Sequence, residues 1–165
     1  MGPFEMLSGK QRELLAYFES LDEVQGTDAL REHVSELLQE LWLHVRLTER
    51  QLQPLVVRVE GHTRALQEAE VLLTLHELMA ELEWFPCGSV EWLARLMALE
   101  DTVLAHVRSL ELQIFPRLSE ALDEQEKRDL VRRLAATREA LWLEMHREGP
   151  SFQDWDSDNS CPANT

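Results

Sequence analysis

Residues 106–116 read HVRSLELQIFP, and residues 44–54, which lie 62 positions earlier, read HVRLTERQLQP. The two stretches share His, Val, Arg, Glu, Gln and Pro at the same offsets. An internal repeat of this kind is typical of two copies of one supersecondary unit that pack together. The repeat therefore predicts a fold made of two related halves.

The composition predicts an all-α chain. The 165 residues are rich in the helix-forming types Leu, Glu, Ala and Arg, and they include only six Gly and six Pro. The formal net charge is −15, and no basic cluster stands out on any predicted helix face. Nucleic acid and anionic membrane surfaces are poor partners for such a chain, so we predict neither.

Targeting signals are not visible in the sequence. The first residues lack a basic segment followed by an apolar one, so no signal peptide is expected. Charged residues interrupt every long apolar stretch, which predicts no membrane span. Cys87 and Cys161 form neither a metal-type spacing nor a disulfide framework. These features predict a cytoplasmic protein.

Five helices are predicted from apolar spacing, capping residues and breaks, over about residues 5–21, 27–54, 60–83, 90–121 and 124–147. Four amphipathic helices with short connections favour an up-down-up-down four-helix bundle. We therefore expect the bundle over residues 1–122, an additional C-terminal helix packed on it over 123–147, and an acidic flexible tail over 148–165.

Histidines lie on three of the predicted apolar stripes, which have steps of three and four residues. The second helix has the stripe Val34, Leu37, Leu41, His44, Thr48, Leu52 and Leu55. The fourth helix has Leu96, Leu99, Val103, His106, Leu110 and Ile114. The stripe assigned to the third helix is Val59, His62, Leu66, Ala69, Leu73, His76 and Ala80.

These stripes predict that His44, His62 and His106 point into the bundle. A single histidine on an apolar face is usually a buried side chain bonded to a carbonyl or carboxylate. Three of them, two at matching repeat positions, favour metal ligation, since neutral imidazole is a common ligand for iron, zinc and copper. Acidic residues such as Glu68 and Glu70 are interpreted as a solvated helix face.

The pattern of a His, a Glu five residues later and a Pro ten residues later, present twice, resembles the hemerythrin-like (HHE cation-binding) family over about residues 1–122. Its marks are His44 with Glu49, His106 with Glu111, and the Glu60-Gly61-His62 segment that opens the third helix. The resemblance implies a four-helix bundle around a non-haem, usually di-iron, centre. Its implied ligands here are His44, His62, His106, Glu111 and Glu49.

Departures from the family pattern point to a reduced site. The family usually places a bridging carboxylate four residues after each His, where this chain has Thr48 and Leu110. Glu49 and Glu111 stand five residues after, which is about 140° around the helix instead of about 40°. The histidine that the family has on its first helix is missing, and Gln11 or Glu5 is the oxygen donor closest to that role.

The sequence thus predicts a non-enzymatic, hemerythrin-like cation-binding protein with a reduced or lost metal site, linked to iron, oxygen or redox binding. Non-haem iron or no metal at all are both compatible with the residues. The alternative is a metal-free helical-bundle module that acts through an interaction or regulatory surface, with a protein partner or a second copy of the chain.

Overall fold

The structure, a computed structural model, describes residues 1–148 and is all-helical over that range. The first half contains α1 (Pro3–Glu19), the 3₁₀ turn η1 (Ser20–Glu23), α2 (Thr27–Leu47), the π-helical turn η2 (Thr48–Leu52) and α3 (Gln53–Glu60). The second half contains α4 (His62–Glu81), the 3₁₀ turn η3 (Leu82–Trp84), α5 (Val90–Ser109), the π-helical turn η4 (Leu110–Ile114), α6 (Phe115–Ala121) and α7 (Glu124–Glu148).

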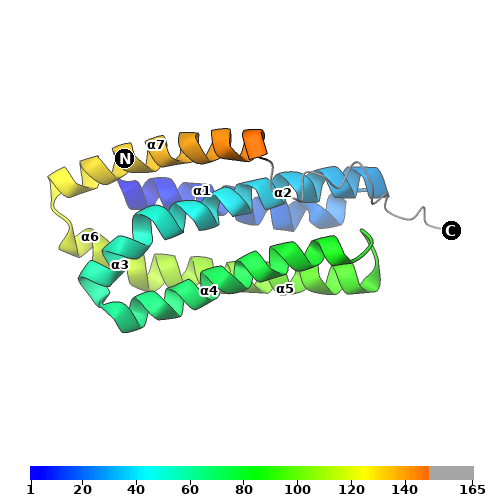
Figure 1. The fold of residues 1–165 in the computed structure, drawn as a ribbon, viewed down its shortest axis with the longest axis horizontal. Helices are drawn as coiled ribbons and strands as arrows, with labels where there is room; N and C mark the ends of the chain where they lie inside the picture. The colour runs from blue at the N-terminus through cyan, green and yellow to red at the C-terminus, as the bar shows by residue number, and fades with distance from the viewer. Residues whose placement is uncertain (149–165) are drawn as a thin grey trace.

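The long helices lie roughly along one direction, with α4 and α5 side by side below α1 and α2, and α7 above them (Figure 1). None of the described helices is long and apolar enough to cross a membrane. The expected tail begins at Glu148, which is the last residue of α7, and the remaining tail residues lie outside the described range.

Capping residues begin α5 and α7. The Ser89 hydroxyl accepts a hydrogen bond from the Trp92 backbone N–H at the start of α5. At the start of α7, the Asp123 carboxylate accepts from the Glu126 N–H while the Glu126 carboxylate accepts from the Asp123 N–H. This reciprocal capping box satisfies two backbone donors that a helix start would leave unpaired.

The two repeated stretches share one unusual feature, a π-helical turn at the same offset. Residues 48–52 and 110–114 form these turns, and Pro54 and Pro116 each occupy the second position of the helix that follows. A proline inside a regular α-helix clashes with the carbonyl four residues before it. The widened turn changes the hydrogen-bond register directly before the proline, so the helix continues instead of ending.

The helix that we predicted to end near Pro54 therefore continues through α3 to Glu60. The break falls at Gly61, whose φ of +89° lies in the left-handed region that glycine adopts without a steric penalty. The next helix, α4, begins at the following residue, His62.

Two of the three predicted stripes are correct. All seven stripe residues of the second predicted helix and all six of the fourth are buried. The third stripe is wrong, because α4 buries the neighbouring set Ala65, Glu68, Leu72, Leu75 and Met79. Leu66 and Leu73, which we expected in the core, are exposed.

The apolar face of α7 is covered by the same chain. Leu130, Leu134, Leu141 and Met145 are buried in the core that also contains Phe4, Leu43 and Leu55. The helix lies against α1, α2 and η2, and its Arg138 forms an ion pair with Glu40 at 3.0 Å. Burial of this face ties α7 to the first half of the repeat.

We expect Leu141→Ala to lower the free energy of unfolding by about 2–5 kcal/mol, because Leu141 is completely buried and its truncation leaves a cavity. Leu143→Ala on the exposed side of the same helix should change it by less than about 0.5 kcal/mol. Urea denaturation of both variants measures the difference. Equal effects would mean that α7 does not pack as described.

Candidate functional site: a buried histidine pair

His44 of α2 and His106 of α5 meet in the middle of the protein. Their Nε2 atoms are 3.2 Å apart, and the ring planes are inclined by 69° with centroids 5.3 Å apart. Both side chains are buried, and each comes from the same position of one half of the repeat. The duplicated sequence therefore brings two equivalent imidazoles into contact.

Both rings are held in the neutral form. Burial lowers the pKa of His44 to about 4. Burial, with a smaller contribution from the neighbouring His44, lowers the pKa of His106 to about 3. With one proton on each ring, the Nε2–H of one imidazole can donate to the lone pair of the other Nε2. Without a bound cation, this single hydrogen bond is the interaction that the pair offers at neutral pH.

Glu68 of α4 lies behind His106. Its Oε2 atom is 3.9 Å from the His106 Nδ1 atom, too far for a hydrogen bond, and neither of these buried atoms has a hydrogen-bond partner within residues 1–148. The other carboxylate oxygen, Oε1, accepts a hydrogen bond from the Ser109 hydroxyl at 3.2 Å and forms an ion pair with Arg64 at 3.5 Å. Glu68 thus connects the histidine pair to a polar network.

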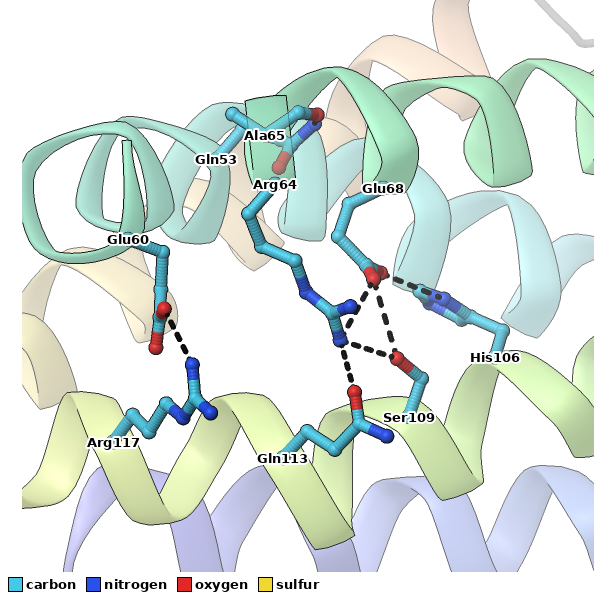
Figure 2. A network of polar contacts seen from close by, with 9 residues as sticks. All are labelled: Gln53, Glu60, Arg64, Ala65, Glu68, His106, Ser109, Gln113 and Arg117. Atoms are coloured by element: carbon cyan, nitrogen blue, oxygen red, sulfur yellow. Dashed lines mark hydrogen bonds and ion pairs between the residues drawn. The ribbon is translucent and has the colours of Figure 1, made fainter. Parts of the chain in front are cut away.

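Figure 2 shows this network, which continues from the buried Glu68 to the exposed Gln113. Arg64, on the same helix as Glu68, reaches across to α5 and η4, where it donates to the Ser109 hydroxyl and to the Gln113 side-chain oxygen. Separate contacts join Arg117 to Glu60, and Gln53 to the Ala65 carbonyl. A buried carboxylate beside Arg64 keeps a charged partner, which offsets part of the cost of its desolvation.

Gln11 is a second polar residue at this depth. It lies on α1, one turn from Leu7 and from Leu14, which line a cavity together with His44. Gln11 is completely buried, and neither its amide oxygen nor its amide nitrogen has a hydrogen-bond partner among the described residues. An unpaired amide in a protein core is costly, so Gln11 marks a place where a polar partner would be stabilising.

The cavity beside His44 has a volume of about 90 Å³ and lies between α1, α2 and α7. Most of its lining is apolar, and Lys10, Glu40 and Arg138 supply charged groups. It is large enough for several water molecules. His44 is therefore the member of the pair that lies against this cavity.

The structure brings together two of the five predicted ligands. His62 is exposed at the first position of α4, so our expectation that it points inward is wrong. The reason is the register of α4, in which Ala65 and Glu68 take the inward positions and rotate His62 outward.

Glu49 and Glu111 also point away from the pair, as their five-residue offset indicates. Glu49 accepts a hydrogen bond from Arg46 and contacts His76 Nε2 at 2.7 Å. Glu111 is half-buried and lines a hollow against the α1 residues Ser8 and Arg12. Neither carboxylate is placed to join His44 and His106 on a common ion.

The donor set does not fit a di-iron centre. Thr48 and Leu110 occupy the buried positions one turn after the two histidines, and the Thr48 hydroxyl donates to the His44 backbone carbonyl at 2.8 Å. No group of three His, Cys, Asp or Glu side chains within residues 1–148 is arranged to hold a metal ion. Two imidazoles without a bridging carboxylate cannot hold two irons in the way that the family resemblance implies.

Our interpretation of Glu68 as part of a solvated helix face is wrong, because Glu68 is buried, although the sequence contained a signal for this. The leucines of the correct stripe, Leu72 and Leu75, together with Met79, place residue 68 on the same face when their spacing is continued backward. Gln11 falls in the same way between Leu7 and Leu14, at steps of four and three. In both cases, a polar residue on an otherwise apolar stripe indicated a buried polar side chain.

Comparisons of the chain with models of known protein families, with curated proteins and with solved structures found no match. The resemblance to the hemerythrin-like family rests on the repeat and its spacing.

The neutral histidine pair should make the protein less stable in mild acid. In the unfolded chain these histidines have the ordinary pKa of about 6.5, so they bind protons below that pH. In the folded protein their pKa values are about 4 for His44 and about 3 for His106, so they stay neutral until the pH falls to those values. We expect the free energy of unfolding to fall from neutral pH toward pH 4, by up to about 1.4 kcal/mol per pH unit for each histidine.

Urea denaturation at a series of pH values measures this slope. The double variant His44→Leu/His106→Leu is the matched control, because it keeps every other titrating group. If it loses stability as steeply as the parent chain, the pair is not the cause.

Replacement of Gln11 by leucine should stabilise the protein by about 1–3 kcal/mol, because it removes a buried amide without a partner and keeps a similar volume. Thermal and urea unfolding of Gln11→Leu at neutral pH test this. A loss of stability would instead indicate that the amide bonds to a ligand or an internal water.

Proposed function

We propose that the chain is a hemerythrin-like protein, an up-down-up-down four-helix bundle of α1, α2–α3, α4 and α5–α6 with α7 added. In this proposal its cation site is reduced to one ion, held by His44 and His106, and the protein is not an enzyme. Support comes from the duplicated unit and from the two equivalent histidines that the units bring into contact.

The Nε2–Nε2 distance carries the proposal. Two imidazoles bound at 2.0–2.1 Å to one ion place their nitrogens roughly 2.9–3.4 Å apart for right-angle to tetrahedral geometry. The observed separation is 3.2 Å. The pKa values of both histidines lie far below neutral, so neither ring has an extra proton that a cation must displace. At most, the cation displaces the Nε2 proton of the hydrogen bond between the two rings.

Glu68 supports this role from behind His106. A histidine that binds a metal through Nε2 usually donates its Nδ1–H to a carboxylate or carbonyl, which orients the ring and raises its basicity. The Glu68 Oε2 atom is the carboxylate oxygen placed for that, at 3.9 Å from Nδ1. A movement of less than about 1 Å would form the hydrogen bond.

Imidazole donors suit Zn²⁺, Cu²⁺, Ni²⁺ and ferrous iron. Water from the cavity beside His44, and the Gln11 amide oxygen at the same depth, are the groups that could complete the coordination of one ion. A second ion would need the carboxylates that Thr48 and Leu110 replace.

We expect at most one cation per chain. Added metal should raise the melting temperature by mass action, the rise should disappear with chelator, and His44→Leu should abolish it. His62→Leu is the control, since it removes an exposed histidine that the site does not use. Metal analysis and thermal melts provide the measurements. Two irons per chain with near-ultraviolet oxo-bridge bands would contradict the single-ion site.

The second candidate function is a metal-free interaction module. The observation that favours it is the hydrogen bond that the two imidazoles can already make with each other, with no third His, Cys, Asp or Glu placed to bind an ion with them within residues 1–148. In that case metal leaves the melting temperature unchanged, and the double variant His44→Leu/His106→Leu is neutral or stabilising because it removes both buried partners together. The same melts therefore separate the two functions.

A further inference from the structure

The stripe that sequence reasoning assigned to the core is an apolar seam on the outside of α4. Its members recur at alternating intervals of four and three residues: His62, Leu66, Ala69, Leu73, His76 and Ala80. All are exposed except His76, which is half-buried beside Glu49. Leu66 is 65% exposed and Leu73 is 57% exposed. Helix α4 therefore has two apolar faces, and its own fold uses one of them.

This spacing is the heptad pattern of a coiled-coil seam. With Leu66 and Leu73 at a positions, Ala69 falls at d, and Glu70 and Glu77 both fall at e. Residues at e and g flank the seam and form the ion pairs that select a partner helix. The g positions are filled by Leu72 and Met79, which are buried in the protein's own core. The acidic side is thus the only flank that faces outward.

The charges on this flank are not used inside the described chain. The side chains of Glu70 and Glu77 are exposed, and neither takes part in an ion pair or side-chain hydrogen bond within residues 1–148. Other acidic residues of α4 are paired, with Arg64 on Glu68 and Arg95 on Glu81. The surface thus has two unpaired carboxylates, one heptad apart, beside two exposed leucines. A partner for it must have both apolar side chains and positive charges.

We propose that the outer seam of α4 binds an amphipathic helix of another protein, one with apolar residues on its own seam and Lys or Arg at the flanking positions. The leucines would enter its apolar face, and Glu70 and Glu77 would pair with its basic residues. This inference supplies a partner for the interaction-module function and is independent of whether the histidine pair binds a cation.

A second copy of the chain fits the seam less well. In an antiparallel pair of α4 helices the e positions face each other, so glutamates would meet glutamates. In a parallel pair each e position faces a g position, and the g positions here are buried. The net charge of −15 adds further repulsion between copies. A basic partner helix meets none of these obstacles.

The seam is short, which sets the expected strength of binding. From residue 62 to residue 80 it spans about 27 Å at 1.5 Å per residue. A contact of this size falls below the area of a stable protein–protein interface, so a reversible complex with a Kd on the order of micromolar is expected.

The experiment titrates the full chain, by calorimetry at low salt, with three synthetic helices of about three heptads each. The first has leucines on its seam and lysines at the flanking positions, the second has glutamates in place of the lysines, and the third keeps the lysines but has serines on the seam. We expect binding of the first alone, with at least about tenfold weaker binding when the ionic strength is raised to about 1 M.

Variants of the chain locate the contact. Leu66→Ser/Leu73→Ser should weaken binding of the lysine helix about tenfold or more, and Glu70→Lys/Glu77→Lys should transfer the preference to the glutamate helix. Met97→Ser is the matched control, because Met97 is 67% exposed on α5 and should leave binding unchanged. All these positions are on the surface, so an unchanged melting temperature verifies that the fold is intact.

Three results would overturn the proposal. Equal binding of the lysine and glutamate helices would show that the acidic flank selects nothing. Unchanged binding by the double serine variant would place the contact elsewhere. Sedimentation that shows a dimer of the chain, lost on Leu66→Ser/Leu73→Ser and without binding of any helix, would assign the seam to a second copy.

Discussion

A neutral hydrogen bond between two buried imidazoles connects the halves of this protein. His44 and His106 lie in a core made mainly of apolar side chains, and an imidazole there must either lose its charge or find a counter-charge. Burial supplies the first solution, since the pKa of each ring falls well below neutral. Each ring then needs the other as a partner, because a lone neutral imidazole would leave a donor or an acceptor unpaired. The contact of His44 with His106 therefore satisfies one polar atom on each ring across the two halves.

A π-helical turn follows each of the two histidines in the chain. Each turn begins four residues after its histidine and ends two residues before its proline. The same turn sets the direction of the neighbouring carboxylate, which leaves Glu49 on the side of His76 and Glu111 beside α1. π-helical turns are frequent at functional sites. Here each turn follows a buried histidine at the same offset, and Thr48 and Leu110 occupy the first position of the two turns.

Polar groups without partners mark the same layer of the core. Gln11, the Glu68 Oε2 atom and the His106 Nδ1 atom all lack hydrogen bonds within residues 1–148. Such groups are rare in native cores because each costs free energy. Two of them, on Glu68 and His106, lie beside the histidine pair, and His44 lines a cavity. The network through Arg64 and Ser109 connects Glu68 to the surface.

The second helix runs past its predicted end near Pro54 to Glu60, but the sequence by itself determined the all-helical character and the inward faces of α2 and α5. On these helices the apolar stripe that includes the histidine is complete, and the repeat supports it twice. It could not determine α4, because two stripes with the same spacing run along that helix, one through Leu66 and Leu73 and the other through Leu72 and Leu75. Both stripes have the same steps of three and four residues, so the spacing of apolar residues does not show which one is buried. Only tertiary structure decides between them, since burial depends on what the neighbouring helices offer. Ser109 and Gln113 of the second half give Arg64 and Glu68 their partners, and that pairing turns the Glu68 face inward and leaves His62 in solvent.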